Sequence, residues 1–220
     1  MRGRLGGLLI SLLLLLLLYP LFARSALGAA FLVSAITLVV FSAIIASGIE
    51  RRRLILLILL AIPLFIEIWD DPFSTSNIQD PVPLVLLLVF LIIATGSLIA
   101  ALRRSTEVHI EELFGAVSVY LLLGLIWSTA FMLINALQPG SFAFGGVAAS
   151  MDWQDLLYYG YVSLVTIGYG DITPVSDFAR SFSVLAGITG TLYVAIVIAQ
   201  SASLLPRNVE RARQARIKRR

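Results

Sequence analysis

The segment Thr166-Ile-Gly-Tyr-Gly-Asp171 decides how this chain is arranged, because it places two glycines one residue apart between two long apolar segments. Gly168 and Gly170 lack a Cβ atom, so each can adopt the left-handed backbone conformation that other residues avoid. Alternating the backbone hand turns successive carbonyl groups toward the same side. Carbonyl oxygens that face one axis coordinate cations, so the segment predicts an ion-binding loop.

The composition is that of a membrane protein with several spans. Hydrophobic residues make up 59% of the 220 residues and charged residues 13%, and the mean hydropathy is +0.97. Such values lie well outside the range of soluble domains. The absence of cysteine excludes a disulfide framework, a thiolate metal site and a cysteine nucleophile.

Six apolar segments are long enough to be membrane spans, although the third is short and contains Pro63. They are Leu5–Phe22, Leu27–Gly48, Leu54–Trp69, Pro83–Leu102, Leu113–Leu137 and Asp177–Leu205. The first also resembles a signal peptide, because a basic start precedes it and small residues follow it. Its apolar core exceeds the roughly 7–15 residues of such peptides, so we expect it to be retained as a span. An amphipathic stretch, Ser105–Phe114, predicts an interfacial helix before the fifth span.

A shorter helix is expected between the last two spans. Asp152 can cap a helix from Trp153 to Val165, with Asp155 as an acidic partner in its first turn. At about 1.5 Å per residue this helix is too short for a hydrocarbon core of about 30 Å, so we expect it to enter and leave by the same face. The small residues of Ser141–Ser150 predict a loop at the membrane surface.

The positions of the basic residues predict the orientation in a plasma or inner membrane. With both termini in the cytoplasm, fourteen of the 16 Lys and Arg residues lie on that side, and Arg24 and Arg180 lie outside. Acidic residues concentrate in the outward loops, where they would raise the local cation concentration.

The letters T-I-G-Y-G-D resemble the signature of the tetrameric potassium channels. The resemblance implies that K⁺ is the permeant ion, that no other cofactor is needed, and that the chain is not an enzyme. It further implies that the carbonyls of Thr166, Ile167, Gly168 and Tyr169, with Gly170 completing the loop, replace the hydration shell of the ion. Since one chain carries one loop, a homotetramer is expected. The family also places paired aromatics behind the loop, which implies supporting roles for Tyr158 and Tyr159 and a contact from Tyr158 to Asp171.

Several of these roles have alternatives. Tyr158 and Tyr159 could belong to an interfacial aromatic belt. Gly187 lies where related channels bend their inner helix for opening, but glycine also serves close helix packing in membranes. Val162 lies where some members keep a carboxylate behind the loop, so that support is missing here.

The resemblance is closest to small prokaryotic six-span channels, and it divides the chain into three parts. Residues 1–104 form a four-span module, residues 105–205 a pore domain, and residues 206–220 a basic cytoplasmic tail that could contact anionic lipid. Residues 83–102 carry no charge, so the module lacks the arginines of a voltage sensor. The gating stimulus stays open, including whether His109 senses protons. No nucleic-acid partner is expected.

Two other functions compete with a potassium channel. A potassium transporter subunit would carry four degenerate loops in one chain, whereas this chain has one. A non-selective cation pore is disfavoured by Tyr169, the position usually lost in non-selective relatives.

Overall fold

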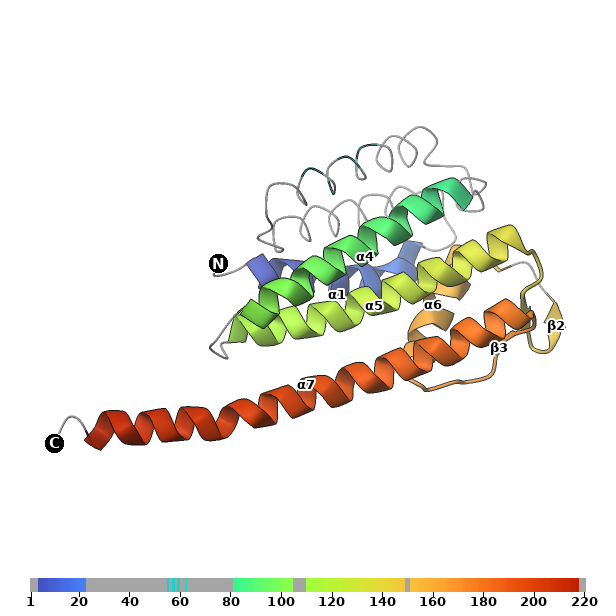
Figure 1. The fold of residues 1–220 in the computed structure, drawn as a ribbon. Coiled ribbons are helices and arrows are strands. Elements are labelled where there is room, and N and C mark those ends of the chain that lie inside the picture. The colour runs from blue at the N-terminus through green and yellow to red at the C-terminus, as the bar shows by residue number, and fades with distance from the viewer. Residues whose placement is uncertain are drawn as a thin grey trace.

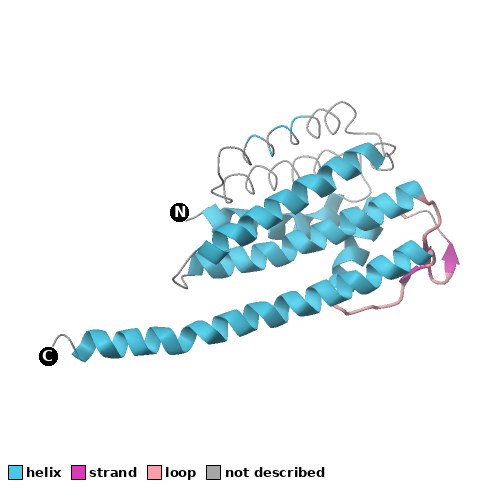
Figure 2. Ribbon diagram, in the orientation of Figure 1, coloured by secondary structure: helices cyan, strands magenta, loops and turns pink. Residues whose placement is uncertain are grey.

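The computed structural model describes residues 4–22, 55, 57, 59, 62, 81–104, 110–148 and 151–217 of the chain. Most of this part is helical (Figures 1 and 2). In chain order the elements are α1 (Arg4–Phe22), α4 (Pro81–Arg104), α5 (Ile110–Leu137), β1 (Phe142–Phe144), β2 (Val147–Ala148), α6 (Trp153–Leu164), β3 (Ile172–Pro174) and α7 (Asp177–Ile217). The predicted second span, almost all of the predicted third, and His109 lie outside the described residues.

Three of the described helices are long and apolar enough to cross a membrane: α4, α5 and the first part of α7, Asp177–Ala199. The apolar part of α1, Leu5–Leu21, is shorter. The 19 residues of α1 nevertheless extend over roughly 28 Å, close to the thickness of a hydrocarbon core. The expected class, an all-α membrane protein, is confirmed at this level, and the number of six spans stays a prediction.

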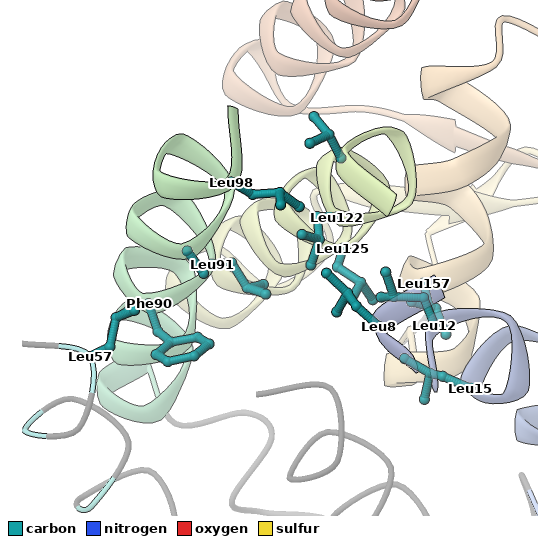
Figure 3. Packing of buried hydrophobic residues seen from close by; sticks show 12 residues of the cluster. Leu8, Leu12, Leu15, Leu57, Phe90, Leu91, Leu98, Leu122, Leu125 and Leu157 are labelled. Carbon is teal, nitrogen blue, oxygen red and sulfur yellow. The ribbon is translucent and has the colours of Figure 1, made fainter. Parts of the chain in front are cut away.

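One apolar core joins the N-terminal helices to the C-terminal ones. Helix α4 runs antiparallel to α5, and α1 packs against α5 as well (Figure 1). Figure 3 shows leucines from these helices and from α6 meeting one another. The buried members include Leu8 and Leu12 of α1, Leu91 and Leu98 of α4, Leu122 of α5 and Leu157 of α6. The described helices on the two sides of residue 104 therefore share one core.

Two helix boundaries differ from the sequence-based expectation. Helix α5 begins at Ile110 and is continuous with the fifth span, so residues 110–114 do not belong to a separate interfacial helix. Helix α7 does not end near Leu205 but continues to Ile217, and its second half extends beyond the other helices (Figure 1). Residues 207–217 contain neither glycine nor proline, so the backbone stays helical although this part of the chain is no longer apolar.

A small antiparallel sheet, in the order β2-β1-β3, lies at the end of the molecule opposite the start of α1 and the end of α7 (Figure 1). The expectation of a loop over residues 141–150 was therefore wrong for the strands. Gly145 and Gly146 connect β1 to β2 with φ values of 57° and 84°, as a type I′ hairpin turn requires. The strands contain three and two residues, too few to show a pattern in the sequence.

Candidate ion-coordinating site

Helix α6 begins where the sequence predicted and presents its end to the glycine-containing loop. The N-cap Asp152 is extended (φ −80°, ψ 166°), and its backbone N–H donates to the Asp155 carboxylate at 3.2 Å. The helix has 12 residues, about 18 Å, which is too short to span a bilayer. Its last residue is Leu164, one before the predicted end.

The backbone after α6 alternates in hand over residues 166–170. Gly168 and Gly170 have φ values of 59° and 81°, the left-handed conformation expected from the sequence. Thr166 has a φ of 58° and is the only described residue other than glycine with a positive φ. That conformation costs a residue with a Cβ roughly 1–2 kcal/mol, and the sequence gives no sign of it. This alternation is the backbone pattern from which the sequence predicts that successive carbonyl groups face one side of the loop.

The inner end of the loop is held by the last turn of α6. The N–H of Thr166 donates to the Ser163 carbonyl and the N–H of Ile167 to the Val162 carbonyl, each at 3.1 Å. Val162, at the position where a carboxylate was noted as missing, is buried and supports the loop through its backbone instead. In a single chain the side chain of Ile167 is 54% exposed and that of Tyr169 is 68% exposed. This face of the loop is therefore open to another molecule.

The outer end of the loop carries the contact expected between Tyr158 and Asp171. The Tyr158 hydroxyl donates to the Asp171 carboxylate at 2.9 Å. The Tyr158 ring also stacks on the Tyr169 ring, with centroids 6.3 Å apart and planes within 5°. One residue of α6 thus contacts the loop through both its ring and its hydroxyl.

Tyr159 points in a different direction from Tyr158. Its ring packs edge-on against Phe131 of α5 and Phe142 of β1, with centroids 5.0 and 5.2 Å away. Its hydroxyl lies 2.6 Å from that of Ser183 on α7. Tyr159 therefore joins α6 to three neighbouring elements, α5, β1 and α7.

Helices α5 and α6 cross closely at two glycines, which the sequence analysis did not identify. A Cβ on Gly124 would collide with the Tyr161 ring, and one on Gly160 would lie 2.7 Å from the Ser128 Cα. Hydroxyl groups complete the crossing, because Tyr161 donates to the Leu121 carbonyl at 2.7 Å and Ser128 Oγ lies 3.1 Å from the Leu157 carbonyl. Small residues spaced for close packing are common in membrane helices, so their presence alone did not indicate this crossing.

Helix α7 passes the inner end of the loop at two further glycines. A Cβ on Gly187 would lie 3.6 Å from Thr166 Cγ2, an ordinary contact, whereas one on Gly190 would collide with the Leu164 carbonyl. Helix α7 is unbroken at Gly187, so its expected role as a hinge stays a prediction. The packing requires glycine at position 190, and no feature of the sequence marks this glycine.

The described residues contain no group of three or more His, Cys, Asp or Glu side chains that could hold a metal ion. The groups that converge near the loop are carbonyls, hydroxyls and one carboxylate. Carbonyl and hydroxyl oxygens are the kind of groups that coordinate alkali cations in selectivity filters.

The comparisons with known proteins agree with this chemistry. The model of a family described as "Ion channel" matches residues 119–206, a range that contains most of α5, the whole of α6, the loop and most of α7. No curated protein and no solved structure matches the chain. Residues 119–206 are therefore similar to the ion-channel domain that this family model describes.

Proposed function

We propose that four copies of this chain assemble around a potassium-selective pore, and that residues Thr166–Gly170 form its filter. The observation that carries this proposal is the alternation of left-handed residues at positions 166, 168 and 170. The carbonyls of Thr166, Ile167, Gly168 and Tyr169 would then replace the water around K⁺, assisted by the Thr166 hydroxyl. Helix α6 ends at this loop, so the negative end of its dipole favours a cation there.

The exposure of α7 supports an assembly of several copies. Large apolar side chains on this helix are uncovered in the single chain, among them Val184 (63%), Leu192 (55%) and Ile198 (63%). Lipid would cover some of this surface, but Ile167 and Tyr169, whose backbone would coordinate the ion, are exposed as well. One loop supplies only one side of a coordination shell, so four copies around an axis complete it.

The module before the pore is proposed to be insensitive to voltage. Helix α4 has no charged residue from Pro81 to Leu102. Moving one elementary charge through 100 mV yields about 2.3 kcal/mol, and a helix without charges gains nothing from the field. The start of α1 and the end of α7 lie at the same end of the molecule, which supports both termini facing the cytoplasm (Figure 1).

The test is the reversal potential of the purified protein in planar bilayers, with K⁺ on one side and Na⁺ on the other. A reversal near the potassium equilibrium potential is expected for the parent protein. Gly168→Ala should abolish this potassium selectivity. A Cβ at position 168 would have free space around it, but the φ of 59° strains any residue other than glycine.

Gly140→Ala is the matched control for this experiment. Gly140 has a φ of 83° and free space around a Cβ, and it lies in the turn after α5 instead of the loop. The Gly140→Ala protein should lose about as much stability as the Gly168→Ala protein and keep its potassium selectivity. A reversal near zero for the parent protein would replace the proposal with a non-selective cation pore.

A further inference from the structure

We infer that the β1–β2 hairpin, residues 142–148, is a positioning element for the outer end of the filter. The inference rests on the proposed function and adds to it a structural support that α6 does not supply. It is carried by backbone hydrogen bonds between the hairpin and the residues that directly follow Gly170.

The backbone of the filter segment is hydrogen-bonded at its two ends and not between them, where the Tyr169 ring stacks on Tyr158. At the inner end, the N–H groups of Thr166 and Ile167 bond to α6. Within the described residues, Gly168, Tyr169 and Gly170 take part in no backbone–backbone hydrogen bond. The next residue with a backbone–backbone hydrogen bond is Asp171. The position of its backbone therefore determines where the carbonyls of Gly168, Tyr169 and Gly170 lie.

Asp171 is held from two independent directions. Its carboxylate accepts from Tyr158 of α6 at 2.9 Å, and its backbone carbonyl accepts from the N–H of Gly145 in the hairpin at 2.9 Å. The side-chain contact alone leaves the peptide after Asp171 free to rotate. The hairpin removes that freedom.

The hydrogen-bond ladder continues for the next five residues. Strand β3 pairs with β1 in the register Phe144 to Ile172, Ala143 to Thr173 and Phe142 to Pro174. Beyond the strands, the Ser141 carbonyl accepts from the N–H of Val175 at 2.8 Å and from that of Ser176 at 3.3 Å. Phe142 adds a side-chain anchor, because it is fully buried against Tyr159. The segment between the filter and α7 is thus bonded to the hairpin and to Ser141, the residue that precedes it.

The turn geometry shows which amides of the hairpin face β3. In a two-residue hairpin the closing residues, here Phe144 and Val147, bond to each other, and backbone groups then alternate in direction along each strand. Ala143 and Gly145 therefore direct their N–H groups toward β3, as the bond from Gly145 to Asp171 shows. Ala148, which is paired opposite Ala143, directs its N–H away from the sheet, because β2 is an edge strand.

This difference between two paired alanines provides a matched test. Ala143→Pro removes an N–H that faces β3, and Ala148→Pro removes one that faces away from the sheet. Ala143→Pro should make the potassium current decay about fivefold faster, because one hydrogen bond corresponds to a factor of about five. The same variant should have a higher Na⁺ permeability than the parent protein. Ala148→Pro should leave the decay and the reversal potential of the parent protein unchanged.

A second pair of variants covers the case in which Ala143→Pro does not assemble. Replacing the amide N–H of Gly145 by an ester oxygen, through semisynthesis, deletes the donor of the bond to Asp171 and otherwise only weakens the preceding carbonyl, that of Phe144, as an acceptor. The same replacement at Gly146 is the control, because the Gly146 N–H makes no backbone–backbone bond in the structure. Faster decay with the Gly145 ester alone supports the inference.

Equal behaviour of the two esters, or of the two proline variants, overturns the inference while the parent protein stays potassium-selective. A parent protein without potassium selectivity is a different result, since it overturns the proposed function.

Discussion

The hydroxyl of Tyr159 on α6 lies 2.6 Å from the hydroxyl of Ser183 on α7. Ser183 also lies 2.6 Å from the Ala179 carbonyl, to which it donates its one hydroxyl hydrogen, so Tyr159 is the donor in this pair. The bond joins the helix that precedes the loop of residues 166–170 to the helix that follows it. Few side-chain bonds in the described chain connect these two helices, which makes the pair a specific point of coupling.

Tyr159→Phe should reduce the free energy of unfolding by about 1 kcal/mol, because it removes one hydrogen bond and keeps the buried ring. Ser183→Ala should cost a similar amount. Unfolding in mixed micelles measures both, and the double variant should cost less than the sum, since the two changes remove the same bond. Strict additivity would show that the pair does not interact.

Tyr158→Phe should destabilise the outer end of the proposed filter and leave the fold intact. The variant loses the hydrogen bond to the Asp171 carboxylate, a type of bond worth about 1.5 kcal/mol or more, and keeps the ring that stacks on Tyr169. We expect a faster decay of the potassium current in bilayer recordings. Tyr159→Phe is the control, because its hydroxyl does not contact the loop, and an equal decay in both variants would contradict the prediction.

Gly190→Ala and Gly187→Ala should have different effects. A Cβ at position 190 would lie 2.8 Å from the Leu164 carbonyl carbon, so α7 must move away from α6 and the thermal stability of the assembly should fall. A Cβ at position 187 has ordinary contacts, and alanine favours a straight helix by about 1 kcal/mol over glycine.

Gly187→Ala should therefore assemble normally and, since Gly187 is proposed as a hinge, show a lower open probability in single-channel recordings. An unchanged open probability would contradict a hinge at Gly187. Normal stability of the Gly190→Ala protein would contradict close packing of α6 against α7.

Leu12→Ala should destabilise the protein by about 2–5 kcal/mol, the usual cost of a cavity at a fully buried leucine. Leu12 belongs to the core that α1 shares with α5 and α6, while Leu17 on the same helix is 72% exposed. Leu17→Ala is the control and should have little effect in a detergent melt.

The same core contacts predict that the first apolar segment is retained and not cleaved as a signal peptide. Edge-on packing of Tyr19 against Trp153, with centroids 6.2 Å apart, ties the end of α1 to the start of α6. Intact-mass spectrometry of the purified protein should show a mass that includes α1. A mass that lacks it would contradict this prediction.

The sequence by itself determined the features that depend on neighbouring residues. Long apolar segments marked α4, α5 and α7, and Asp152 with Asp155 marked the start of α6. The glycines of the loop indicated the left-handed positions 168 and 170, because only glycine adopts that conformation at little cost. The Tyr158 to Asp171 contact was expected from the family resemblance, and its residues are 13 positions apart.

Only the tertiary structure decided the features that depend on distant segments. The partner of Tyr159 lies 24 positions away and the hydroxyl of Tyr161 bonds to a carbonyl 40 positions away. The left-handed Thr166 follows from its bond to the end of α6 and its position against α7, not from its own preference. Likewise, β1 is a strand because β3, which follows the loop of residues 166–170, pairs with it. Packing of this kind depends on how whole helices meet, and short stretches of sequence carry no record of it.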